Sequence, residues 1–330
     1  MRITVVGAGA IGGFFACKLF DAGHDVSVVT RGATLEAIRK HGLRLQTGHD
    51  LLIAPLRATS EPEELGAQDL VIFAVKAPSL PIAVQNAKAL IGPHTVIIPA
   101  INGLPWWYFL KSSAALSGTR LKAVDPDGVI EANLPTDAVL GCVVFPSCTV
   151  LSPGVIKHMS GSKIALGEPA GNTSRRLSDI ANMFHHSGFD AHICENIREE
   201  IWLKLLGNAC FNPVSLLVGS STDELIDDPL LNDLFIVMMD EVLELGNRLN
   251  ISPEIDSRQR IAITRKLGTV KTSMLQDVEG HKPVEIEAIL GTLISVADLA
   301  GAPMPRVRAV YALARMRAKK LGLLPGYLLE

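Results

Sequence analysis

The sequence lacks the cysteine pattern of a disulfide-stabilised or zinc-binding protein. Its five cysteines include no Cys-x-x-Cys pair, and most of them stand among apolar residues. We therefore expect reduced thiols and a cytoplasmic protein. The nine histidines show no ligand spacing either, so no metal is expected.

The sequence also lacks an excess of either charge and lacks long apolar runs. Its 31 Lys and Arg against 34 Asp and Glu give a net charge of -3, so neither nucleic acid nor an anionic membrane surface is expected as a partner. Apolar runs such as Val143 to Phe145 are far shorter than the roughly 20 residues that cross a bilayer. A chain of 330 residues that is 48% hydrophobic and 20% charged suggests a globular protein of two domains.

Strand and helix patterns alternate in the first part of the chain. Strands are expected over residues 2–6, 25–30, 70–75 and 95–99, and helices over 10–22 and 34–41. This alternation predicts an α/β domain with a parallel, doubly wound sheet of the Rossmann type. Further strands over 139–145, 155–158 and 163–166 are expected to extend that sheet, and a helix is expected over 175–186.

The second part of the chain shows helical periodicity almost throughout. Helices are predicted over residues 199–210, 230–249, 256–267, 283–300 and 307–320. The chain is therefore divided into an α/β domain over 1–193 and an all-helical domain over 194–330, and the motifs below indicate dinucleotide binding for the first and the substrate and catalytic residues for the second.

A glycine motif follows the first strand. Gly7-Ala8-Gly9-Ala10-Ile11-Gly12 is a G-x-G-x-x-G that opens a helix, the context in which this motif indicates dinucleotide binding. The first glycine permits a tight turn, the second lets a pyrophosphate approach the backbone, and the third lets helix and strand pack closely. The alternative is an ordinary glycine-rich turn between a strand and a helix.

The end of the second strand indicates which dinucleotide is bound. NAD-binding proteins usually carry a carboxylate there, which bonds the ribose 2′-hydroxyl. This chain has Thr30-Arg31-Gly32 instead, and Arg31 could form paired hydrogen bonds with a 2′-phosphate. The pattern favours NADP(H), with a plain surface arginine as the alternative.

A narrow polar stripe marks an otherwise apolar helix. Lys204, Asn208 and Asn212 stand four residues apart and share one face, while nearly all residues between them are apolar. One amine and two amides suggest the wall of a polar cleft; a solvated stripe is the alternative. Pro213 is expected to kink or end this helix.

A second polar segment runs from Thr272 to Glu287. Its hydroxyls and amides, among them Ser273, precede a short loop and a new helix. Pro283 is expected in the first turn of that helix, which would place Glu285 near the positive end of the helix dipole. A carboxylate stabilised only by that dipole is the alternative.

Taken together, these motifs resemble those of the ketopantoate reductases (2-dehydropantoate 2-reductases). The resemblance runs nearly end to end, and its two helical-half motifs are much more specific than the glycine loop. The motifs are Gly7-Ala8-Gly9-Ala10-Ile11-Gly12-Gly13, Arg31-Gly32, Ala74-Val75-Lys76, Asn102-Gly103, Trp202-x-Lys204-x-x-x-Asn208-x-x-x-Asn212-Pro213, Ser273-Met274-x-x-Asp277 and Glu285-Ile286.

The resemblance implies a Rossmann domain followed by a helical domain of the 6-phosphogluconate-dehydrogenase-like type. It implies hydride transfer from NADPH to a 2-oxo acid, above all to ketopantoate in pantothenate biosynthesis. Lys204 looks like the general acid, which would stabilise and protonate the carbonyl oxygen. Glu285 looks like the carboxylate that orients the substrate. The remaining site residues follow the same resemblance: Asn102, Asn208, Asn212 and Ser273 for the substrate, and Lys76 and Asn102 near the cofactor.

The chain also departs from the family pattern. Ile101 stands where the family commonly has Gln, and Trp106-Trp107-Tyr108 follows the Asn-Gly pair. These aromatic residues either pack under the cleft or reshape the substrate pocket. A reductase of another 2-oxo acid and an NADP-binding sensor without catalysis therefore stay open as alternatives, and a homodimer is a further expectation.

Overall fold

The computed structural model describes residues 1–111, 115–251 and 253–324 of the chain. The chain divides into two compact units. The first consists of Met1–Ile101 and Asp127–Ile197, and the second of Asn102–Pro126 and the residues from Arg198 onward. The predicted domains, 1–193 and 194–330, are contiguous ranges. In the structure, by contrast, the segment Asn102–Pro126 packs with the second unit. The division into domains 1–193 and 194–330 remains a prediction.

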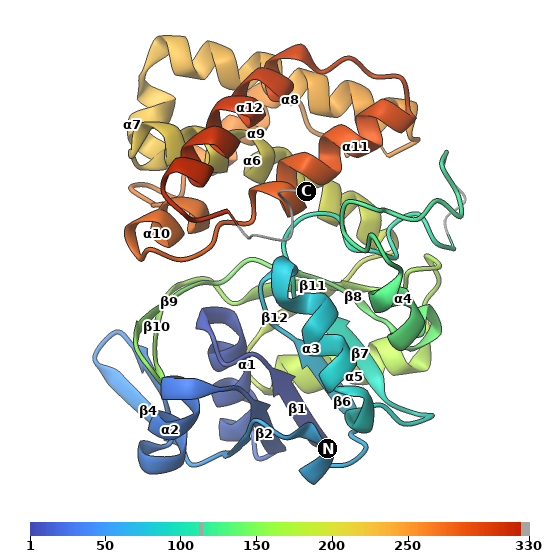
Figure 1. Cartoon of the computed structure of the whole chain (residues 1–330), viewed down its shortest axis with the longest axis vertical. Coiled ribbons are helices and arrows are strands. Elements are labelled where there is room, and N and C mark those ends of the chain that lie inside the picture. The colour runs from blue at the N-terminus through green and yellow to red at the C-terminus, as the bar shows by residue number, and fades with distance from the viewer. Residues whose placement is uncertain (112–114, 252, 325–330) are drawn as a thin grey trace. The chain divides into compact units, whose positions relative to one another are not determined.

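The first unit is built around a parallel sheet (Figure 1). Its strand order is β5-β2-β1-β6-β7, and all four neighbouring pairs are parallel. The strands are β1 (Arg2–Val6), β2 (Asp25–Val29), β5 (Arg57–Thr59), β6 (Leu70–Phe73) and β7 (Val96–Pro99). Every residue of β6 is buried, as expected for a strand that is covered on both faces. The predicted Rossmann-type sheet is confirmed.

Two smaller sheets complete this unit. One has the order β4-β3-β10-β9, and the other the order β12-β11-β8. Their strands are β3 (Leu43–Thr47), β4 (Asp50–Ala54), β9 (Ser147–Ser152), β10 (Val155–Ser160), β8 (Gly141–Val144), β11 (Lys163–Gly167) and β12 (Asp190–Ile193).

The expectation that residues 139–166 extend the first sheet is wrong, because β10 pairs with β3 and β9, and β8 and β11 form a separate sheet with β12. Leu45 and Ile156 are register partners in that sheet, and both side chains are buried. An isolated bridge between Ile97 and Val139 joins the first sheet to the segment before β8.

Helices cover the sheets of the first unit. They are α1 (Ala10–Asp21), α2 (Gly32–His41), α3 (Leu80–Asn86), α4 (Val129–Asn133) and α5 (Arg175–His186), with short 3₁₀ turns η1 (Pro62–Glu64), η2 (Ala77–Ser79), η3 (Lys88–Leu90) and η4 (Thr136–Ala138). Helix α1 lies directly on β10, because a Cβ at Gly13 would stand 2.6 Å from Ile156. Phe14, Phe15 and Phe184 fill the core next to it.

The second unit is built from helices (Figure 1). They are α6 (Ile197–Val218), α7 (Thr222–Asp227), α8 (Pro229–Arg248), α9 (Ser257–Arg265), α10 (Ser273–Glu279), the π-helical turn η5 (Glu287–Gly291), α11 (Thr292–Leu299) and α12 (Pro305–Lys320). Helix α12 packs against α8 and η5. The predicted helical half is confirmed.

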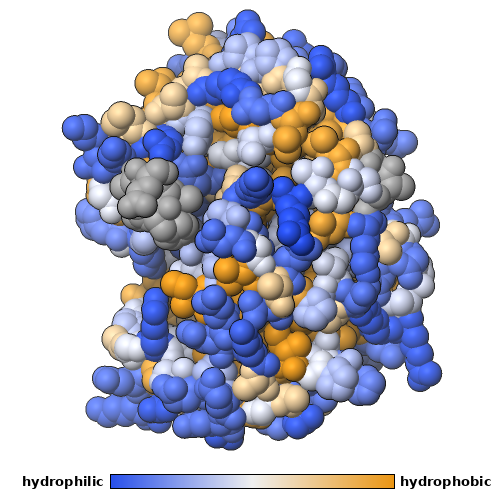
Figure 2. Space-filling view, turned by 45° about the vertical axis from the view of Figure 1, so that its right-hand side comes forward, coloured by the Kyte–Doolittle hydropathy of each residue, from blue (hydrophilic) through white to orange (hydrophobic). Residues whose placement is uncertain are grey.

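Helix α6 continues through Pro213, so of the two expected outcomes, a kink or an end, the helix end is wrong. A proline removes one backbone donor, and the flanking residues Asn212 and Val214 are buried and hold the turn in place. By length and composition alone α6 could cross a membrane, but 72% of its apolar window is buried, as in the core helix of a globular protein. The face drawn in Figure 2 is largely hydrophilic, with smaller hydrophobic patches.

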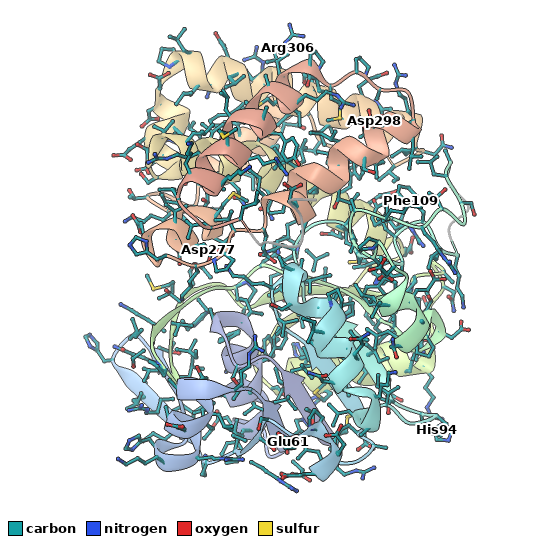
Figure 3. The ribbon with its side chains drawn as sticks, viewed as in Figure 1. Glu61, His94, Phe109, Asp277, Asp298 and Arg306 are labelled. Carbon is teal, nitrogen blue, oxygen red and sulfur yellow. The ribbon has the colours of Figure 1, made fainter. Side chains whose placement is uncertain are left out.

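The aromatic segment is part of the core of the second unit. Trp106 is 2% exposed and Trp107 is 1% exposed, so neither indole presents surface to a substrate. The hydroxyl of Tyr108 donates to the Arg198 carbonyl over 3.0 Å, and Nε of Arg198 donates to the Tyr108 carbonyl over 2.6 Å. These bonds fasten the segment that carries Phe109 (Figure 3) to the start of α6. The burial favours the packing interpretation over a reshaped substrate pocket.

Candidate active site

The glycine loop folds tightly onto its neighbours in the first unit. The Gly7 amide donates to the Val29 carbonyl over 2.9 Å, and Gly7 has a φ of 99°. A Cβ at Gly7 would stand 2.8 Å from Val75, and one at Gly12 would stand 1.8 Å from the Gly7 carbonyl oxygen. Both positions therefore require glycine because of close approach.

Gly9 differs from these two glycines because space lies open beside it. No described atom comes within 4 Å of a Cβ built at Gly9. The first turn of α1 holds no acidic residue, and no side chain caps the helix start. The first N–H groups of α1 thus have no side-chain cap, and such a helix start suits an anionic phosphate.

Arg31 and Lys76 lie at the same edge of the parallel sheet as this loop. Val6 is the register partner of both Val29 and Phe73, so the loops that follow β1, β2 and β6 begin side by side. Arg31 is exposed at the start of α2, and Lys76 is partly buried just before η2. The carboxyl edge of a parallel sheet is where such folds bind dinucleotides.

In the second unit, three polar side chains far apart in sequence form a chain of hydrogen bonds. Nζ of Lys204 donates to Oδ1 of Asn102 over 2.9 Å, and Nδ2 of Asn102 donates to Oε2 of Glu285 over 3.1 Å. Glu285 is only 8% exposed. The neutral amide accepts from the cation and donates to the anion, which satisfies both charged groups at once.

Glu285 stands at the start of the helix that includes η5. Its carbonyl accepts from the Ile289 amide over 3.1 Å, so Glu285 caps the first turn and lies at the positive end of the dipole. The expected position of Pro283 inside the first turn is wrong. Pro283 precedes the helix, which begins at Ile286, and residues 282–285 belong to neither a helix nor a strand.

The two asparagines of α6 differ in burial. Asn208 is partly buried, whereas Asn212 is 4% exposed, and its Nδ2 has no hydrogen-bond partner within the described residues. An unsatisfied buried donor costs about 1–3 kcal/mol. The Asn212 amide is thus a group that a ligand could satisfy.

Ser273 is exposed and begins α10. Its neighbour Thr272 shares a 2.5 Å hydrogen bond with the hydroxyl of Ser215 on α6. The Ser215 hydroxyl also donates to the Asn212 carbonyl over 3.0 Å. The structure therefore brings the start of α10 to the part of α6 that carries Asn212.

Two features near these residues were not predicted from the sequence. Gly103 has a φ of +81°, and a Cβ there would stand 2.2 Å from the Ala288 carbonyl oxygen. Glu200, four residues before Lys204 on α6, has an inaccessible Oε2 without a hydrogen-bond partner in the described part of the chain. The glycine after Asn102 is a sequence signal for a close approach, but the sequence does not say to which residue.

Comparison with known proteins adds independent evidence. The family model described as "Ketopantoate reductase PanE/ApbA" matches residues 3–171. The model described as "Ketopantoate reductase PanE/ApbA C terminal" matches residues 196–318. The two matches together cover both units of the chain.

Individual relatives match over almost their whole length. A 2-dehydropantoate 2-reductase of Mesorhizobium japonicum is 43% identical over 323 residues, which are 98% of this chain and 99% of the relative. A crystal structure of a candidate ketopantoate reductase from Ralstonia solanacearum MolK2 has a TM-score of 0.94 at 43% identity and covers 98% of this chain and 99% of its own. The 2-dehydropantoate 2-reductase from Geobacter metallireducens GS-15 has a TM-score of 0.84 at 25% identity, with 96% and 99% covered.

Proposed function

Since the chain belongs to the ketopantoate reductase family, we propose that it uses NADPH to reduce 2-dehydropantoate to pantoate in pantothenate biosynthesis. It is an oxidoreductase that acts on CH–OH donors. The observation that carries the proposal is the hydrogen-bonded chain of Lys204, Asn102 and Glu285 in the second unit.

Lys204 acts as the general acid in this proposal. The carbonyl oxygen of a 2-oxo acid gains negative charge during reduction, and an ammonium group beside it stabilises that charge and supplies the proton. Asn102 fixes the direction of the amine because its Oδ1 accepts from Nζ over 2.9 Å. When bound, NADPH supplies the hydride.

Four further side chains are proposed to hold the substrate. Glu285 accepts from the substrate hydroxyl and orients it. Asn208, Asn212 and Ser273 bind its remaining polar groups, and the unpartnered Nδ2 of Asn212 supports this assignment. A ligand acceptor at that atom removes the cost of an unsatisfied buried donor.

The chain is a pyridine-nucleotide-dependent oxidoreductase, and we assign NADP(H) rather than NAD as its cofactor. The loop from Gly7 to Gly12 would hold the pyrophosphate, Arg31 the 2′-phosphate, and Lys76 and Asn102 neighbouring groups. Arg31→Ala should weaken NADPH binding by about tenfold or more and leave NADH binding nearly unchanged, because a guanidinium–phosphate pair is charge-assisted and bidentate. Equal losses for both cofactors would contradict the assignment to NADP(H).

The cellular location and the partners of the enzyme are also proposals. A cytoplasmic location agrees with the reduced state of the five cysteines, which form no disulfide within the described residues. A small 2-oxo acid is the proposed partner, rather than a nucleic acid or a membrane. Self-association as a homodimer is a further proposal, which light scattering would test.

Incubation with NADPH and a panel of 2-oxo acids tests the function directly. Reduction of ketopantoate, followed by the loss of nicotinamide absorbance, is the expected result. Turnover of another 2-oxo acid but not ketopantoate would support the alternative substrate. Absence of turnover with every acid, together with tight NADPH binding, would support the sensor interpretation and contradict the proposal.

A further inference from the structure

A second carboxylate lies just after Glu285, on the π-helical turn η5. Glu287 accepts from the Tyr311 hydroxyl over 2.5 Å and from Nε of Arg315 over 2.6 Å. Both donors belong to α12, four residues apart, so they share one face of that helix. The Glu287 side chain is 16% exposed. A largely buried carboxylate with two donors on another helix is held firmly in place.

The carboxylate of Glu287 folds back over its own helix, and Gly291 provides the room. A Cβ at Gly291 would stand 2.5 Å from Oε2 of Glu287 and 3.3 Å from the Tyr311 hydroxyl. Burial and the bond to Glu287 raise the pKa of Tyr311, so its hydroxyl stays protonated and remains a donor. The same carboxylate raises the pKa of Arg315.

The π-helical turn is uncommon and needs such support. Turns of this kind are rare and recur at functional sites, because the wider turn redirects backbone groups. Thr292 donates through its hydroxyl to the Glu287 carbonyl over 3.2 Å. Glu287 is thus tied to α12 through its side chain and to the next turn through its backbone.

The π-helical turn contacts the residue next to Asn102. A Cβ built at Gly103 would stand only 2.2 Å from the Ala288 carbonyl oxygen. A shift of η5 therefore displaces Gly103 and Asn102 directly, and it also displaces Glu285, which caps the same helix. Both changes would alter the direction of the Lys204 amine, which Asn102 accepts from.

We propose that Glu287, held by Tyr311 and Arg315, is a positioning residue that keeps Asn102 and Glu285 aligned with Lys204. This inference rests on the proposed reductase function. It predicts a larger loss in kcat than in cofactor affinity, since the glycine loop and Arg31, the main proposed cofactor residues, belong to the first unit and η5 to the second. Displacements of about 1 Å in catalytic groups can cost on the order of 100-fold in rate.

The test compares Glu287→Gln and Tyr311→Phe with a matched control on α12. Arg308→Ala removes the pair between Arg308 and Asp298 (Asp298 is labelled in Figure 3). This is likewise an arginine–carboxylate contact of α12, and it joins α12 to α11 rather than to η5. We expect Glu287→Gln to lower kcat by about 10- to 100-fold. Tyr311→Phe should also lower kcat, but by a smaller factor. The Kd of NADPH should change much less than kcat, and Arg308→Ala should behave as the unaltered protein.

Two further readouts do not depend on turnover. Hydrogen exchange over residues 286–292 should be faster in Glu287→Gln than in Arg308→Ala. The rate at which an amine reagent modifies Lys204 should also change. An unchanged kcat, or a loss of NADPH affinity as large as the loss in kcat, would overturn the inference. If the unaltered protein reduces no 2-oxo acid, the proposed function fails, and exchange and amine reactivity alone decide the role of Glu287.

Discussion

Nζ of Lys204 lies 2.9 Å from Oδ1 of Asn102, although 102 residues separate them in the sequence. The same amide donates to Glu285, a further 183 residues away from Asn102. All three residues belong to the second unit, so their arrangement is a property of that unit alone. A cation whose direction is fixed in advance stabilises a developing oxyanion without reorganisation during the reaction.

Replacement of Lys204 by alanine should therefore reduce kcat far more than cofactor binding. General acid catalysis typically contributes about 10²- to 10⁴-fold, and a loss of that size is expected. Lys204→Arg keeps the positive charge but does not release a proton near neutral pH, so it should stay slow. Steady-state rates and NADPH titrations measure both effects. Near-normal activity in Lys204→Arg would mean that the residue acts through its charge alone.

The close contact between Gly103 and Ala288 leads to a second prediction, about an alanine at position 103. Gly219 provides a matched control. Both glycines have a φ of +81°, but no described atom lies within 4 Å of a Cβ at Gly219. Each alanine variant pays roughly 1–3 kcal/mol for its backbone conformation. Gly103→Ala also meets the Ala288 carbonyl, so it should unfold at lower denaturant concentration than Gly219→Ala and should lower kcat. Equal midpoints would show that the loop moves away without cost.

Local patterns predicted the parts of the fold whose signal lies within one segment. The predicted helix over residues 175–186 coincides with α5, and the strand over 2–6 coincides with β1. The glycine loop is also local, since Gly12 closely approaches Gly7 in the same turn and Gly7 approaches Val75 just after the neighbouring strand β6. Alternation of strands and helices was sufficient to give the parallel sheet.

Contacts between distant segments could not be predicted in the same way. The expectation for β10 was wrong because its partner β3 lies more than one hundred residues earlier in the chain. Pro213 was expected to kink or end the helix, yet α6 continues beyond it between buried neighbours. Motifs selected Lys204, Asn102 and Glu285 separately, but nothing in the sequence indicated that Asn102 bonds both charged groups or that Gly103 meets Ala288.

The thiol of Cys148 gives a prediction about pH. Burial raises its pKa from 9.0 to about 12, so the folded protein keeps this thiol protonated. Because the thiolate is the reactive form, alkylation at pH 8 should be roughly a thousandfold slower in the folded than in the unfolded protein. Folded-state stability should fall as the pH rises from 9 towards 12, since only the unfolded chain then loses this proton. Cys148→Ser should show a shallower fall; an identical pH dependence would mean that Cys148 is not responsible.

Gly9 and Gly12 separate what the glycine loop needs for folding from what it needs for binding. A Cβ at Gly12 would stand 1.8 Å from the Gly7 carbonyl oxygen, so Gly12→Ala should lower the melting temperature of the free protein. Gly9 has a φ of -79°, which alanine adopts readily, and open space beside it, so Gly9→Ala should melt like the unaltered protein.

The added methyl group of Gly9→Ala fills the space proposed for the pyrophosphate, and the Kd of NADPH should rise by about 10-fold or more. Thermal unfolding without cofactor and NADPH titration distinguish the two variants. If Gly9→Ala binds NADPH as tightly as the unaltered protein, the phosphates do not lie over Gly9, and the open space beside that residue has another explanation.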